Sequence, residues 1–265
     1  MIKTNLFEET ETHKIVLKKS NFSVLEYQKD ISVSPEHAET AYFSSEMGVR
    51  KRQLICVINP ESGVLAQRGI MQLMMGNVNV VTNVQGLGDL AKKFVESKVT
   101  GETGIKPHYS GNGVLVFEPT FRHVLLEDMS DWNGNLVVED GMFLACQDSI
   151  EIKVSAQTTA SSAILGGEGL FNPMLSGNGI IALESPVPRE ELIEIELHDD
   201  ILKIDGNMAI AWSKSLKFTV ERTTPTLIGS AVAGEGLVNV YKGTGKVLVA
   251  PVAHNRGIST PKTKK

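Results

Sequence analysis

The sequence has little of what would place it among disulfide-rich, metal-binding or membrane-spanning proteins. Only two of its 265 residues are cysteines, Cys56 and Cys146, and they lack the paired spacing of a zinc site. Both lie in apolar surroundings, so we expect buried free thiols rather than a disulfide. No run reaches the roughly 18 apolar residues of a membrane span, and no N-terminal run suits a signal peptide. The expectation is therefore a cytoplasmic protein without a membrane span.

Positive charge is also in short supply. The formal net charge is −5, because 26 lysines and arginines face 31 aspartates and glutamates. Broad, sequence-independent binding of nucleic acid or of anionic membranes needs a surplus of lysine and arginine. The composition therefore argues against bulk nucleic-acid binding, although it leaves a local basic patch open.

Catalytic and cofactor motifs are equally scarce. The six histidines are scattered, and the sequence has no Gly-x-Ser-x-Gly elbow and no phosphate-binding loop of the Walker type. The run Gly86–Ala91 matches G-x-G-x-x-A, but a dinucleotide site needs a βαβ unit, and a repeated β segment follows instead. We therefore predict no catalytic, cofactor-binding or metal-binding residues, no cofactor and no enzymatic activity. A hydrolase assembled from distant residues is the remote alternative.

What the sequence does contain is a long internal repeat. A Gly-x-Gly pair begins at residues 111, 177 and 243, and both steps are 66 residues (177 − 111 and 243 − 177). Glycine and asparagine supply the positive φ angles of tight hairpin turns, and the short apolar run after each pair indicates a strand. A constant long period indicates one supersecondary unit made three times. The equivalent glycines are Gly111, Gly113, Gly177, Gly179, Gly243 and Gly245.

These patterns predict an all-β fold of three similar, antiparallel, sandwich-like repeats packed about a pseudo-threefold axis. Alternating apolar residues at 150–154 and 216–220 mark equivalent strands, and residues 77–80 give a weaker version. Extra residues in the first repeat hold a predicted helix near 88–97, and Ser34-Pro35-Glu36 predicts the start of another short helix. The predicted divisions are an N-terminal arm at 1–21, repeats at 22–100, 101–166 and 167–252, and a disordered tail at 253–265.

Several features allow two interpretations. Strand exchange across the repeat boundaries is left open, and residues 15–17 form either an edge strand or part of the arm. The run Met71–Met75 fits core filler, with a partner-docking patch as the alternative. Each repeat also has an equivalent glutamate, which fits a carboxylate that accepts hydrogen bonds from its own turn. A ring of carboxylates that binds a cation or a basic partner is the alternative. These glutamates are Glu102, Glu168 and Glu235.

The three Gly-Glu…Gly-x-Gly segments, with the runs Asp140-Gly141-Met142 and Asp205-Gly206-Asn207 between them, resemble the altered-inheritance-of-mitochondria protein 24 family over roughly residues 22–251. The resemblance implies the fold type of the tryptophan-RNA-binding attenuation protein, arranged about a pseudo-threefold axis. Bacterial members of the family are mostly uncharacterised, and mitochondrial relatives are linked to inner-membrane organisation. The resemblance therefore implies a scaffolding role, and no catalytic residues carry over from it.

The expected function is that of a non-enzymatic scaffold or protein-interaction protein with an unknown protein partner. Homo-oligomerisation is left open. A module that binds RNA or a small ligand on the same β fold is the alternative, and it rests on fold analogy alone.

Overall fold

The computed structural model of the protein describes residues 2–82, 106–156, 171–222 and 237–252. The predicted helix near 88–97, the tail at 253–265 and the three repeat glutamates, Glu102, Glu168 and Glu235, lie outside the described residues.

The described chain is mostly β-strand, in agreement with the predicted all-β class, and it forms two antiparallel sheets. The first sheet runs in the order β1-β2-β3-β6-β4-β9-β12-β7, with β5 paired to β6 beside this path. Its strands are β1 (His13–Lys19), β2 (Phe22–Tyr27), β3 (Arg52–Ile58), β4 (Val64–Ala66), β5 (Met71–Val81), β6 (His108–Phe117), β7 (His123–Asp128), β9 (Phe143–Gln147) and β12 (Ile180–Ser185).

The second sheet runs in the order β10-β11-β8-β14-β16-β13, with β15 paired to β16. Its strands are β8 (Asn135–Val138), β10 (Ile150–Ala156), β11 (Phe171–Gly177), β13 (Ile193–Asp205), β14 (Ala209–Ser213), β15 (Lys217–Arg222) and β16 (Leu237–Val249). Helical segments are short: η1 (Pro35–His37), α1 (Ala38–Glu46), η2 (Met129–Trp132) and η3 (Arg189–Glu191).

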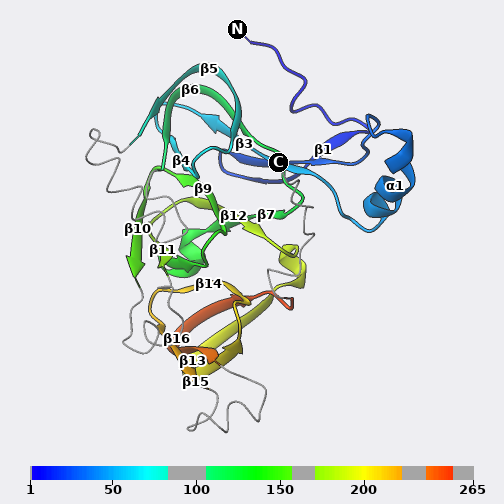
Figure 1. Cartoon of the computed structure of the whole chain (residues 1–265). Coiled ribbons are helices and arrows are strands. Elements are labelled where there is room, and N and C mark those ends of the chain that lie inside the picture. Colours follow the sequence, from blue (N-terminus) through cyan, green and yellow to red (C-terminus); the bar gives the residue numbers. More distant parts are fainter. Residues whose placement is uncertain (1, 83–105, 157–170, 223–236, 253–265) are drawn as a thin grey trace, which may run out of the picture.

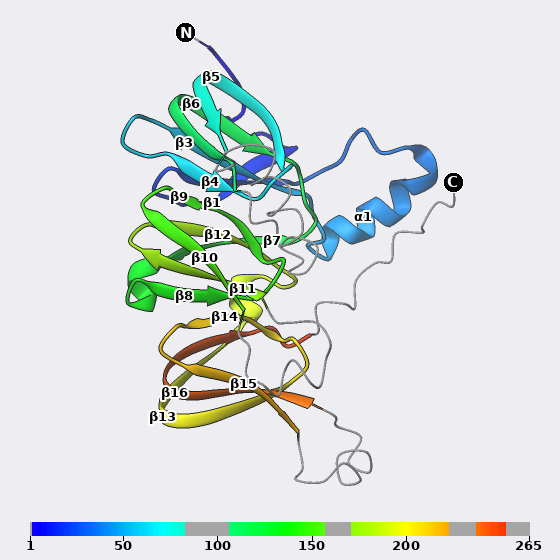
Figure 2. The same ribbon diagram turned by 60° about the vertical axis from the view of Figure 1, so that its left-hand side comes forward.

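The elements stack along one direction, with β5 and β6 at one end and β13, β15 and β16 at the other (Figures 1 and 2). The strands between residues 123 and 185 contribute to both sheets, because β7, β9 and β12 join the first and β8, β10 and β11 join the second. Leu125, Trp132, Leu183 and Leu248 belong to one buried cluster that draws on both sheets. This shared core joins the two sheets.

Local sequence explains the strands. In β15, Phe218 and Val220 are buried while Lys217 and Glu221 are exposed, which is the predicted period-two pattern. Strand β3 is buried almost throughout, as its apolar run indicates. Residues 15–17 lie in β1, an edge strand paired with β2, so the first of the two interpretations holds.

The Gly-x-Gly pairs do not form hairpin turns, and that prediction is wrong. The first and third pairs lie inside the long strands β6 and β16, and the second joins β11 to β12, which belong to different sheets. Each pair marks the place where the chain changes neighbours. Strand β16, for example, pairs with β15 before its glycines and with β14 after them. Corners of this kind need a local bend in a strand.

The first glycine of each pair has a positive φ, which makes such a bend. The φ values of Gly111, Gly177 and Gly243 are 116°, 129° and 124°. A Cβ at Gly111 would lie 2.3 Å from the carbonyl oxygen of Asn77, which is too close for any side chain. The full arrangement of three repeats about a pseudo-threefold axis stays a prediction, as do the divisions at 1–21, 22–100, 101–166 and 167–252.

Two other predictions have clear outcomes. Cys56 and Cys146 are free and buried, as expected. The interpretation of the Met71–Met75 run as core filler is wrong, because Met71 and Met74 are exposed on β5. Strand β5 stands at the margin of the sheet and has a neighbour along only one of its sides within the described chain, so few side chains cover it.

Candidate protein-interaction surface around helix α1

Helix α1 stands off the end of the first sheet, on the segment that connects β2 to β3 (Figures 1 and 2). Ser34 is the N-cap of the preceding turn η1, and Pro35 occupies its first position, as the sequence predicts. The helix ends at Glu46, and Gly48 follows with a φ of 75°, which suits a chain that must turn back. No residue of α1 is buried.

In α1 the small side chains face the protein and the large apolar side chains face solvent, which is the opposite of an ordinary amphipathic helix. Small residues such as Thr40, Ala41 and Ser44 line a hollow between the helix and the sheet. The large apolar residues point to solvent instead, with exposed fractions of 61% for Tyr42, 59% for Phe43 and 81% for Met47 at the helix C-cap. An amphipathic helix that packs on its own sheet would bury those residues.

The hollow under α1 has a volume of about 810 Å³. Apolar side chains of Ile31, Val33, Val49 and Phe121 contribute to its lining. Ile31, Val49 and Phe121 are exposed, so this apolar surface has no cover within the described chain. The helix therefore has apolar groups on its outer side and an apolar hollow on its inner side.

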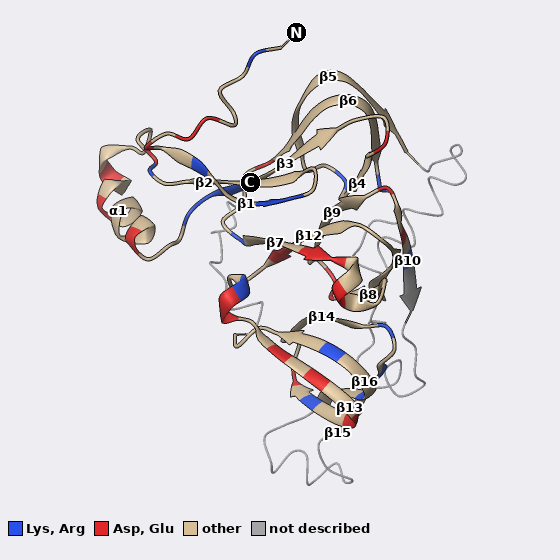
Figure 3. Ribbon diagram, turned by 180° about the vertical axis from the view of Figure 1, so that it is seen from behind, with Lys and Arg blue, Asp and Glu red and all other residues tan. Residues whose placement is uncertain are grey.

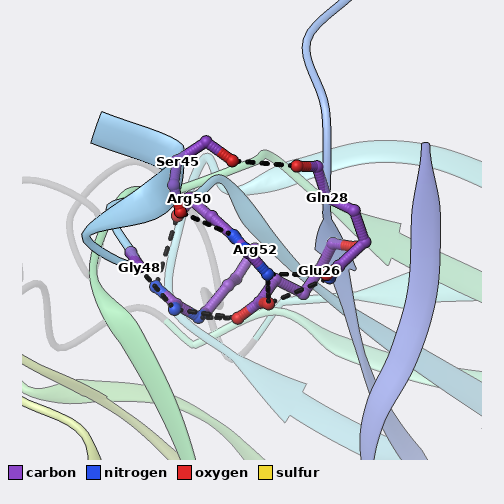
Figure 4. Close-up of polar contacts among 6 residues, drawn as sticks. All are labelled: Glu26, Gln28, Ser45, Gly48, Arg50 and Arg52. Carbon is purple, nitrogen blue, oxygen red and sulfur yellow. Dashed lines mark hydrogen bonds and ion pairs between the residues drawn. The ribbon is translucent and has the colours of Figure 1, made fainter. Parts of the chain in front are cut away.

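A polar cluster holds this segment in place, and we name Glu26, Arg50 and Arg52 the Glu26 clamp (Figure 4). Arg52 donates from Nε to Glu26 Oε2 at 2.9 Å, and Arg50 donates from Nη1 to Glu26 Oε1 at 3.2 Å. Arg52 also donates to the carbonyl oxygen of Gly48, and Arg50 donates to that of Ser45, both at 3.2 Å. The clamp thus ties the end of α1 to β2 and β3 through charge-assisted hydrogen bonds.

The charges of the clamp support one another. Partial burial alone would raise the pKa of Glu26, but the hydrogen bond of Gln28, the charge of Arg52 and the hydrogen bonds of both arginines outweigh it and lower the pKa. Burial and the charge of Arg52 lower the pKa of the nearby His123. Glu26 is therefore ionised and His123 neutral near pH 7, so the arginines keep their anionic partner.

The charged residues of the helical segment are acidic. Residues 34–47 contain Glu36, Glu39 and Glu46 and neither lysine nor arginine, and α1 shows red without blue in Figure 3. The cations at the margin of the hollow are paired, since Lys51 bonds to Asp30 at 2.8 Å and Lys29 to Glu11 at 3.3 Å. The exposed surface of α1 is therefore apolar and negative.

The repeat-equivalent glycines lie elsewhere, at the strand corners, and they do not approach α1. A second polar feature that sequence reasoning missed is the pair of His108 Nε2 and Asp148 Oδ2, at 3.0 Å, with each side chain about one-third exposed. Cys146 is close to this pair in sequence, but burial raises the pKa of its thiol, which keeps it protonated. The described residues contain no group of three or more potential metal ligands.

The described chain is therefore an all-β protein of two antiparallel sheets with one short, exposed helix whose surface is apolar and acidic. The chain belongs to the mitochondrial biogenesis AIM24 family, whose model matches residues 43–252. This confirms the resemblance in the sequence. The matched part begins inside α1, at residue 43, so the first half of the helix lies outside it.

Two similar proteins come from Streptococcus pyogenes. An uncharacterized protein of Streptococcus pyogenes serotype M6 is 26% identical over 193 residues, which cover 70% of this chain and 75% of that protein. A crystal structure from a structural genomics consortium, of a protein from Streptococcus pyogenes, is 25% identical with a TM-score of 0.57. It covers 77% of this chain and 89% of its own. Within the described residues, no helix is long and apolar enough to cross a membrane.

Proposed function

We propose that the protein is a non-enzymatic scaffold that docks a partner protein on helix α1. The observation that carries the proposal is the outward position of Tyr42, Phe43 and Met47 on a helix that the Glu26 clamp holds in place. Aromatic side chains and methionine are enriched in protein interfaces, and rigid aromatic anchors lose little entropy on binding. A held helix therefore presents its anchors in a fixed geometry.

The charge of α1 narrows the chemistry of the partner. Glu36, Glu39 and Glu46 surround the apolar residues, so a segment with both basic and apolar side chains would complement the surface. An anionic membrane would meet like charge here and is disfavoured. The partner that fits is a basic, amphipathic protein segment.

The first experiment uses two synthetic amphipathic peptides, one of leucine and lysine and the other of leucine and glutamate, with fluorescence anisotropy as the readout. We expect the basic peptide to bind and its affinity to fall with salt. The variant Tyr42→Ser/Phe43→Ser should bind it about tenfold or more weakly. Ile201→Ser, at a residue 49% exposed on β13, is the matched control and should bind like the wild type. Equal binding by all three proteins would contradict the proposal.

Two further experiments distinguish a protein partner from a membrane. Co-sedimentation with phosphatidylglycerol vesicles should show no binding, and binding that depends on Tyr42 and Phe43 would replace the protein partner by a membrane. Affinity purification should then recover a protein that the wild type and Ile201→Ser retain and Tyr42→Ser/Phe43→Ser loses. Cross-linking should map the contact to a basic segment of that protein.

A small apolar ligand in the hollow is the second candidate, because about 810 Å³ lies within the usual range of ligand sites. Ala41→Phe would place a ring in the hollow and should weaken binding of the apolar fluorophore 1-anilinonaphthalene-8-sulfonate. If Ala41→Phe leaves fluorophore binding unchanged, the hollow is not such a site.

Two broader proposals accompany this function. We infer three structural repeats about a pseudo-threefold axis, supported by the similar φ values at Gly111, Gly177 and Gly243. A cytoplasmic location is supported by two free, buried cysteines, which suit a reducing compartment.

A further inference from the structure

We propose that the edge strand β5 pairs antiparallel with β5 of a second copy of the chain, about a twofold axis at Asn77. This interface is separate from the α1 surface. It rests on three observations about β5: a free edge, the absence of charge, and a self-complementary order of side chains.

The first observation is the free edge. Strand β5 pairs with β6 along its length and with no other strand within the described residues. Every residue of β5 is exposed or half-buried. An edge strand presents unpaired backbone N–H and C=O groups, which another strand can satisfy. The register on β6 is regular from Leu73 to Val81, so this part of β5 keeps an unbroken ladder along its inner side. Gly76, beside the proposed axis, has a positive φ of 92°, so the strand bends there.

The second observation is the absence of charge. Charged side chains, prolines and bulges are the features by which proteins prevent an edge strand from pairing with another chain. Each of the other described edge strands carries at least two charged residues, as β1 does with Lys14, Lys18 and Lys19. Strand β5 has neither a charged residue nor a proline, and it is tan throughout in Figure 3. Two copies of β1 would oppose lysine to lysine, whereas two copies of β5 can meet without repulsion.

The third observation selects a second copy as the occupant. In an antiparallel pair with Asn77 opposite Asn77, opposed residue numbers sum to 154. Leu73 then faces Val81 and Met74 faces Val80, and all four are exposed apolar residues. Because alternate residues share a face, these two apolar pairs lie on opposite faces of the strand. Self-pairing therefore covers apolar side chains on both faces at once.

The test begins with the mass of the full chain, measured by light scattering on a size-exclusion column over a range of concentrations. We expect a dimer. Met74→Lys and Val80→Lys should each raise the dissociation constant about a hundredfold or more, because lysine would enter an uncharged interface twice. Ile201→Lys, on the charged edge strand β13, is the matched control and should dimerise like the wild type. A wild type that is monomeric at every concentration would overturn the proposal, as would dimers that survive both β5 variants.

Cysteine substitutions test the register and do not depend on the lysine variants folding. A residue on the twofold axis faces its own copy, so Asn77→Cys should form an intermolecular disulfide under mild oxidation. Leu73→Cys and Asn79→Cys should not, because their copies lie several residues apart. Cys56 and Cys146 are buried and should not react. Equal cross-linking at all three positions would refute the pairing. Tyr42→Ser/Phe43→Ser should still dimerise, and Met74→Lys should still bind the basic peptide, so the two proposals fail separately.

Discussion

Polar side chains hold helix α1 in place, whereas packed aromatic side chains hold the core of the second sheet together. In the second sheet, Trp212 stacks on Phe218 with ring centroids 5.4 Å apart and meets Tyr241 edge-on at 5.3 Å, all three buried. At α1, Tyr42 and Phe43 form a similar edge-on pair at 5.4 Å, but in solvent. The helix relies on the Glu26 clamp instead.

This difference explains why α1 can serve as a docking surface. Burial of apolar side chains stabilises the second sheet by roughly 25 cal/mol for each Å² removed from water. The helix obtains its position from polar contacts, which leaves its apolar side chains available to a partner. Substitutions in the two regions should test that division between structural and binding residues.

The largest effect should come from Trp212→Ala. The side chain is fully buried between Phe218 and Tyr241, so its removal should lower the free energy of unfolding by about 4 kcal/mol. Urea denaturation with circular dichroism measures this change. Trp212→Phe should lose much less, since it keeps most of the packing and removes an indole N–H that has no hydrogen-bond partner.

The next effect should come from the Glu26 clamp. Arg52→Met leaves Glu26 with one arginine and should lower the free energy of unfolding by about 3 kcal/mol. The double variant Glu26→Leu/Arg52→Met should recover part of this loss, because it also removes the half-buried carboxylate that would otherwise keep only Arg50 as its partner. Equal losses in the single and double variants would show that the arginine acts through packing alone.

The sequence predicted the core strand of the second sheet and the start of the helical segment, but not the clamp or the exposed aromatic residues of α1. The alternation at residues 216–220 predicted a half-buried strand, and Phe218 and Val220 are buried there. The helix start at Ser34-Pro35 followed from local chemistry. The clamp joins Glu26 to residues more than 20 positions away, and no local pattern encodes such a contact. The exposure of Tyr42 and Phe43 was also hidden, because periodicity gives spacing but not which side a short helix turns to its sheet. The Gly-x-Gly pairs correctly indicated positive φ. Glycine is favoured both in a hairpin turn and at a bend where a strand changes neighbours, so the sequence did not distinguish the two.

The third prediction concerns pH and contrasts Glu139 with Glu26. Burial, with a further contribution from the charge of Asp140, raises the pKa of Glu139 from 4.5 to about 7. The folded state therefore binds this proton more tightly than the unfolded state. Its contribution to stability is fully present below pH 4.5 and is lost as the pH rises through about 7.

The loss should reach about 2 to 3 kcal/mol above pH 7. Thermal or urea unfolding at a series of pH values measures it, with Glu139→Gln as the comparison. The glutamine variant should lack this decline between pH 4.5 and 8. A wild type and a Glu139→Gln variant with parallel pH profiles would rule out this role for Glu139.

The fourth prediction compares one corner position in the two regions. Gly111 and Gly243 have similar positive φ values, but a Cβ at Gly111 would meet the Asn77 carbonyl oxygen at 2.3 Å, whereas at Gly243 the nearest atom is 3.8 Å away. Both alanine variants carry backbone strain of about 1 kcal/mol or more. Gly111→Ala should lose about 1 to 2 kcal/mol beyond Gly243→Ala, because its Cβ also displaces the β5 backbone. Denaturation midpoints of the two variants measure the difference.

The smallest effect should come from Tyr42→Ser/Phe43→Ser, which removes two aromatic rings from α1. Both rings are more exposed than buried, so the free energy of unfolding should change by less than about 0.5 kcal/mol. The same number of rings removed from around Trp212 would unfold much of the second sheet. Differential scanning calorimetry on the wild type and the variant measures the change. A loss as large as that of Arg52→Met would mean that the rings hold α1 in place and are not free to anchor a partner.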